Sequence, residues 1–139
     1  MRTSVENREG LKQIFKLAYQ KDLLLHFRTN PVDSDTAMEL VDIIGGYNNF
    51  DPAKIKDVMR AFRGQITGYE VGRECSPVIY VWLPYWTHQR EDWEMLETGE
   101  RIPEDELEGL KRSLTTCFKL ALADEVQEVS TSVIRFWWD

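Results

Sequence analysis

Three residues near the middle of the chain have a spacing that could hold a metal ion. His88, Glu91 and Asp92 stand at positions i, i+3 and i+4, which would place them on one face of a helix. An imidazole with carboxylates suits zinc or manganese. The pattern is common in acidic segments, and no second histidine lies nearby in the sequence. We therefore favour a solvated charged face and predict no metal site and no cofactor.

One further histidine and one cysteine carry groups that could do chemistry. An imidazole suits general acid–base work, so His26 could act on a ligand held by Arg28 or Arg135, but a packed or hydrogen-bonded role is favoured. Arg73 would favour the thiolate of Cys75, but no histidine lies close to Cys75 in the sequence to act as its base. The chain also lacks a P-loop and the GxGxxG and GxSxG motifs. The sequence thus leaves catalysis open and favours its absence.

The net charge of the chain comes from one segment. Residues 90–108 contain nine acids and two arginines, which equals the net charge of −7 for the whole protein. Two tryptophans lie at or beside this segment, and acidic groups with aromatic neighbours suit a basic partner. The predicted binding residues of this acidic segment are Trp86, Glu91, Asp92, Trp93, Glu94 and Glu97.

Bulk properties limit the class of protein. A chain of 139 residues is expected to form one domain, spanning 1–139. The acidic pI near 4.9 argues against nucleic acid as a partner. The chain starts without a signal-like apolar region and has no apolar run of membrane-spanning length. The two cysteines have unlike surroundings, which favours a reducing compartment. A cytoplasmic protein with no membrane contact is therefore expected.

The elements that must position these residues follow from periodicity and capping signals. Apolar residues at helical spacing predict a first helix over 5–21, with Leu11, Ile14, Phe15 and Ala18 facing inward. Asp33 or Ser34 and then Asp51-Pro52 begin two more helices, and Pro103 opens a long fourth one. Strands are expected at 23–28, loosely at 65–71, at 77–83 and at 131–138, with a turn at 72–76. This order predicts an α+β, ferredoxin-like βαββαβ fold, an antiparallel sheet with helices on one face and an extra N-terminal helix.

Strand parity then divides the side chains between two sheet faces. One set is purely apolar and belongs under the helices, whereas the other is mixed, aromatic and cationic. The candidate binding residues of this second face are His26, Arg28, Tyr80, Trp82, Arg135 and Trp137. Such a face needs a cover, which could be the N-terminal helix or the C-terminal part of the chain, a second copy of the protein, or a ligand in a pocket. RNA-recognition domains also present aromatic residues on a sheet, but no basic, glycine-rich octapeptide of their kind occurs here.

Three functional hypotheses follow from the sequence. The first is a small, acidic protein-binding module, inhibitor- or adaptor-like, that presents segment 86–108 to a protein with a basic surface. The alternative is a small-ligand-binding protein or a cofactor-poor enzyme with its pocket on the aromatic sheet face. In this alternative the protein could form a homodimer. The third is a structural subunit whose sheet face or acidic segment docks in a larger assembly, and it differs from a protein-binding module only in permanence.

Overall fold

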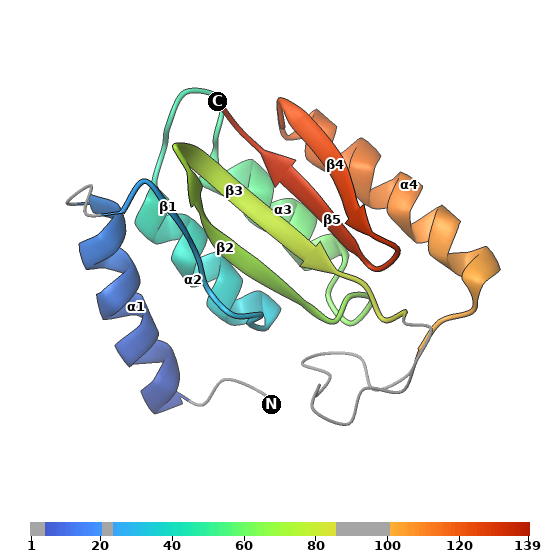
Figure 1. Ribbon diagram of the computed structural model, residues 1–139, viewed down its shortest axis with the longest axis horizontal. Coiled ribbons are helices and arrows are strands. Elements are labelled where there is room, and N and C mark those ends of the chain that lie inside the picture. Colours follow the sequence, from blue (N-terminus) through green and yellow to red (C-terminus); the bar gives the residue numbers. More distant parts are fainter. Residues whose placement is uncertain (1–4, 21–23, 86–100) are drawn as a thin grey trace.

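The computed structural model describes residues 5–20, 24–85 and 101–139, with the side chains of 5–7 and 20 left out. These residues form a five-stranded antiparallel sheet and four helices (Figure 1). The elements, in chain order, are α1 (Val5–Gln20), β1 (His26–Arg28), α2 (Ser34–Ile44), α3 (Pro52–Ala61), β2 (Gly68–Glu74), β3 (Ser76–Trp82), α4 (Glu104–Leu120), β4 (Glu125–Ser130) and β5 (Val133–Trp137). Within the described ranges, none of the helices has the length and apolarity that crossing a lipid bilayer requires.

The strand order corrects the predicted topology. The α+β class and the antiparallel sheet are confirmed, but the strands run in the order β1-β2-β3-β5-β4, which differs from a ferredoxin-like sheet. Strand β1 lies at the edge and pairs only with β2. A further strand, β4, occupies the other edge and forms a hairpin with β5. Two hairpins of neighbouring strands therefore make up most of the sheet, and short local connections favour such pairing.

The sequence analysis missed β4 and placed β2 three residues too early, for identifiable reasons. Strand β4 is the polar run EVQEVS, in which glutamates are poor strand formers. Strand β2 continues to Glu74 through the residues predicted as a turn, and the reversal takes place at the single residue Cys75, whose φ is 63°. The pairing of Glu74 with Ser76 shows how tight this reversal is.

Helix starts agree with the capping signals. Asp33 accepts a hydrogen bond from the Thr36 amide at 2.9 Å, and Asp51 accepts one from the Ala53 amide at 3.0 Å ahead of Pro52. These side chains satisfy amides that have no partner within the first turn of a helix. Thr3 and Glu6 have the sequence spacing of a capping box for α1, but they lie outside the described side chains.

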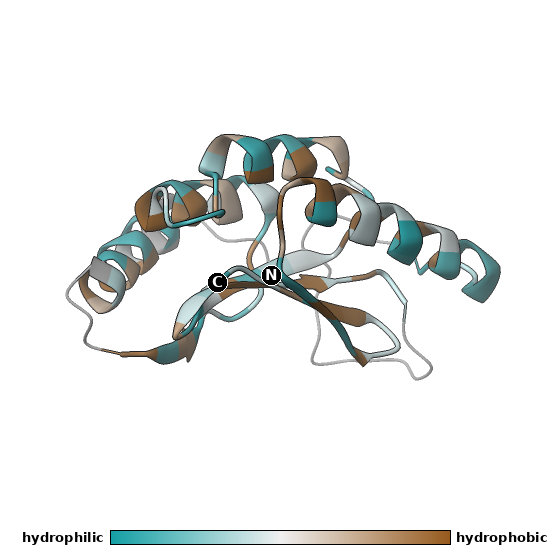
Figure 2. Ribbon diagram, turned by 90° about the horizontal axis from the view of Figure 1, so that it is seen from above, coloured by the Kyte–Doolittle hydropathy of each residue, from teal (hydrophilic) through white to brown (hydrophobic). Residues whose placement is uncertain are grey.

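The helices lie on one side of the sheet (Figure 2). Between them and the sheet lies the main core, which includes Tyr69, Phe118, Phe136 and Trp138, each almost fully buried. Helix α1 packs against α2, and the ring of Phe15 contacts Phe27 of β1 edge to face at 5.4 Å. The predicted inward stripe of α1 is correct for Phe15 and Ala18 but wrong for Ile14, which is 68% exposed.

Candidate functional site

The face of the sheet that points away from the helices carries the candidate site. We call it the open face. Cross-strand register places Arg28, Gly72, Val78 and Trp137 in one row and Glu70, Tyr80 and Arg135 in the next. Because paired residues of neighbouring strands point to the same side, the predicted set does share one face. In the described part of the chain, no helix crosses this face (Figure 2).

One expected cover of this face is therefore wrong. The N-terminal helix packs against α2 and the helix side of β1, because Phe15 and Tyr19 make ring contacts with Phe27. The C-terminal residues do not cover the open face either, since Trp138 is buried in the core on the helix side.

Two glutamates that sequence analysis did not select organise the open face. Glu74 accepts a hydrogen bond from the Tyr80 hydroxyl at 2.7 Å and another from Arg135 Nε at 2.6 Å. Its backbone carbonyl accepts a third from Trp137 Nε1 at 3.0 Å. A strand predicted through Glu74 would have placed this carboxylate opposite the aromatic residues. That signal is hidden in the sequence because Gly72 is typical of a turn.

Glu70 holds the second half of the network. Its carboxylate accepts a hydrogen bond from Trp82 Nε1 at 2.6 Å and lies 3.4 Å from Arg28 Nε. The Arg28 guanidinium also lies 4.0 Å from the centre of the Tyr80 ring, which links the two halves through a cation–π contact. The aromatic and arginine side chains thus have defined positions before any partner arrives.

The network changes the pKa values of two of its members. Burial of the Glu74 carboxyl raises its pKa, but the hydrogen bonds from Tyr80 and Arg135 and the nearby guanidinium charges outweigh this, so the pKa lies below its ordinary value. Burial raises the pKa of Tyr80, and its hydrogen bond to Glu74 raises it further. At neutral pH Glu74 is therefore a carboxylate and Tyr80 a neutral donor.

His26 lies at the edge of this network, opposite Glu74 in the β1–β2 register. Its Nε2 is 3.6 Å from the sulfur of Cys75, a contact between residues 49 positions apart. Both side chains are exposed, and neither Cys75 nor Cys117 is in a disulfide. No histidine is close to Cys75 in the sequence, but the fold brings His26 beside it.

The acidic segment gives no comparable geometry. Trp86, Glu91, Asp92, Trp93, Glu94 and Glu97 all lie outside the described residues, as does the candidate metal ligand His88. Among the residues that are described, no group of three or more His, Cys, Asp or Glu is placed to hold a metal ion.

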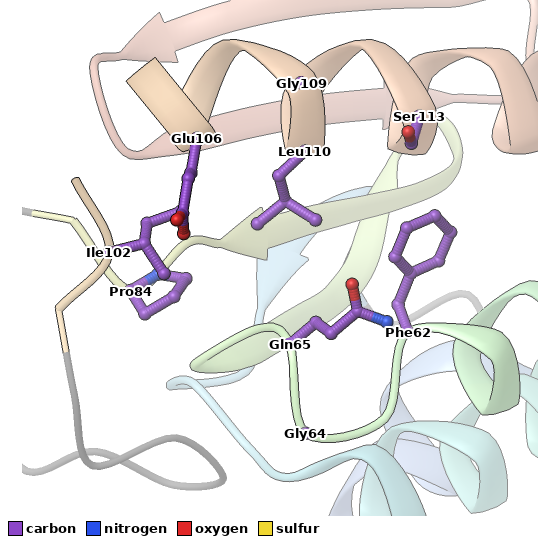
Figure 3. Close-up of a pocket in the computed structure, with 9 residues that line it drawn as sticks. All are labelled: Phe62, Gly64, Gln65, Pro84, Ile102, Glu106, Gly109, Leu110 and Ser113. Atoms are coloured by element: carbon purple, nitrogen blue, oxygen red, sulfur yellow. The ribbon is translucent and has the colours of Figure 1, made fainter. Parts of the chain in front are cut away.

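A cavity of about 460 Å³ lies on the helix side (Figure 3). It separates α4 from the loop after α3 and the end of β3, and sequence analysis selected none of its residues. Its lining residues are Phe62, Gly64, Gln65, Pro84, Ile102, Glu106, Gly109, Leu110 and Ser113. The predicted pocket residues of the open face do not line it.

Comparisons with known proteins add no assignment, since no protein-family model, curated protein or solved structure matches the chain. The site must be interpreted from its own chemistry. On the open face, both carboxylates are already engaged by protein donors, which suits a rigid docking surface better than proton transfer to a substrate.

Proposed function

We propose that this protein is a protein-binding module whose open face docks another protein that carries basic groups. The observation that carries the proposal is the fixed array of Tyr80, Trp82, Arg135 and Trp137, held by hydrogen bonds to Glu70 and Glu74. Tryptophan, tyrosine and arginine are enriched among the few residues that supply most of the binding energy in protein interfaces. Side chains held in place before binding lose little conformational entropy when the partner docks.

Charge supports a basic partner. The two arginines of the open face already lie against Glu70 and Glu74, so the centre of the face is close to neutral. Glu125 of edge strand β4 pairs with Trp137 in the sheet register and is exposed, which adds negative charge at the rim. Rim charges of one sign accelerate association with a partner of the opposite sign.

The acidic segment belongs to the same proposal as a sequence-based prediction. Its charge of −7 over residues 90–108 favours a basic partner, and Glu91, Asp92 and Glu94 are the positions where charge reversal should weaken binding. A homodimer through the open face is the competing outcome.

The test compares a Trp137→Ala variant with the wild type. Proteins captured from an extract of the source cells are identified by quantitative mass spectrometry and purified. Calorimetry then measures the dissociation constant of each captured protein for the wild type and for Trp137→Ala. We expect the dissociation constant to rise by roughly thirtyfold for Trp137→Ala, the effect of losing one interface anchor of about 2 kcal/mol. Leu120→Ala is the matched control, because Leu120 is 75% exposed at the end of α4.

Salt dependence tests the charge argument separately. Glu125→Lys should weaken binding and flatten its dependence on ionic strength, since it reverses a rim charge and leaves the hydrogen bonds of Glu70 and Glu74 in place. The proposal is overturned if no purified partner distinguishes Trp137→Ala from Leu120→Ala. Concentration-dependent self-association that Trp137→Ala abolishes would instead identify a second copy as the occupant.

A further inference from the structure

The pair formed by Cys75 and His26 lies where a thiol can react with molecules in solution. Cys75 Sγ is 3.6 Å from His26 Nε2, within the range of a sulfur–nitrogen hydrogen bond, and both residues are exposed. A nucleophile and a base within such reach are the two parts that thiol chemistry requires. The proposed docking function uses neither group.

The backbone on both sides of the thiol is fixed. The Cys75 amide donates to the Leu25 carbonyl at 2.9 Å, and the Cys75 carbonyl accepts from Arg73 Nη2 at 3.0 Å. Cys75 also has a φ of 63°, a region that residues other than glycine, asparagine and aspartate seldom adopt. These contacts fix the backbone of Cys75, and its sulfur lies beside the imidazole of His26 at 3.6 Å.

The second cysteine provides a comparison within the same chain. Cys117 is half-buried on α4 and packs against the main core, so approach to its sulfur is restricted. A thiol reagent should thus distinguish two cysteines that have the same intrinsic chemistry.

We propose that Cys75 and His26 form a reactive thiol site that exchanges with low-molecular-weight disulfides and leaves Cys75 S-thiolated. In the tautomer that carries its proton on Nδ1, His26 accepts the thiol proton at Nε2. The Cys75 sulfur attacks one sulfur of the disulfide, a new S–S bond forms, and the original S–S bond breaks. The leaving thiolate departs with the bonding electron pair and takes the proton back from the imidazolium. Cys75 is oxidised and half of the disulfide is reduced to a thiol.

The probe is 5,5′-dithiobis(2-nitrobenzoate), an aromatic disulfide that releases a coloured thiolate. Rate constants are measured near neutral pH for the wild type, Cys75→Ser and His26→Gln, and mass spectrometry locates the modified cysteine. We expect Cys75 to react first and His26→Gln to slow it by about tenfold, less than general-base catalysis gives in enclosed enzyme sites because both groups are exposed to water. A second probe, oxidised glutathione, should give a mixed disulfide on Cys75 with the same dependence on His26.

Unfolding supplies the control for position. In concentrated urea the two residues separate, so the His26→Gln effect should vanish and Cys75 should react like Cys117. A folded His26→Gln protein whose Cys75 reacts at the wild-type rate would overturn the proposal. So would a wild-type Cys75 that reacts no faster than Cys117.

Discussion

The side chains of the open face depend on the carboxylate of Glu74 for their fixed positions. It receives the Tyr80 hydroxyl and Arg135 Nε, and its pKa lies below the ordinary value near 4.5. Glu74→Gln removes the charge and leaves the Tyr80 hydroxyl and Arg135 Nε with a weaker acceptor. We expect the free energy of unfolding to fall by about 1–2 kcal/mol at neutral pH, the usual cost of a hydrogen bond to a charged group. Urea denaturation followed by circular dichroism measures it.

The same residue predicts how stability depends on pH. A group whose pKa is depressed by folding stabilises the protein above its unfolded-state pKa, and that contribution disappears as the pH falls through the folded-state pKa. The stability difference between wild type and Glu74→Gln should therefore be constant from neutral pH to about pH 5 and shrink below the ordinary value near 4.5. A difference that stays unchanged down to about pH 3 would contradict the assigned ion pair.

Among the elements, the pairing of β1 with β2 requires a specific residue, a glycine at position 72. A Cβ atom added to Gly72 would overlap the backbone carbonyl oxygen of Phe27 and lie 2.9 Å from the Cα of Arg28. Both are backbone atoms, so β1 would have to shift away. Gly72→Ala should lower the free energy of unfolding by about 2–3 kcal/mol, in the range of overpacking changes.

A second glycine is the matched control for that substitution. Gly109 lies inside α4, and a Cβ there would meet nothing within 4 Å. Gly109→Ala should raise the free energy of unfolding by about 0.5–1 kcal/mol, because alanine favours the helix. Opposite signs for the two changes in urea denaturation are expected, and equal signs would contradict the close approach of β1 to β2.

At the scale of the whole molecule, two adjacent tryptophans have opposite roles. Trp138 is fully buried; its ring contacts Phe50 and Phe118, and its Nε1 donates to the Ala121 carbonyl at 3.0 Å. It thereby joins the sheet to α4 and to the loop before α3. Trp138→Ala should cost about 3–5 kcal/mol of stability, the range for truncating a buried aromatic residue.

Trp137 points to the opposite side and supplies the comparison. It is half-buried on the open face, where it packs against Val78, Tyr80 and Val133. We expect Trp137→Ala to lower stability by less than half as much as Trp138→Ala. A larger loss for Trp137→Ala in thermal or urea unfolding would mean that the open face, and not the helix side, holds the main core.

Local sequence determined the helices, two strands and the division of strand residues between two faces. Capping at Asp33 and Asp51 and the alternation in 77–83 and 131–138 depend on neighbours in the chain, so they can be predicted without tertiary contacts. The set Tyr80, Trp82, Arg135 and Trp137 followed directly from that alternation.

Tertiary structure alone decided what those residues contact. Only the pairing of β2 with β3 shows that Glu70 and Glu74 accept the hydrogen bonds of the open face. The sequence could not show this, because a glutamate in a polar, glycine-containing run predicts a turn as readily as a strand. Likewise, 49 positions separate His26 from Cys75, and only the pairing of β1 with β2 brings them together. Sequence fixes local periodicity through nearest-neighbour sterics, whereas strand order depends on long-range packing that no local pattern encodes.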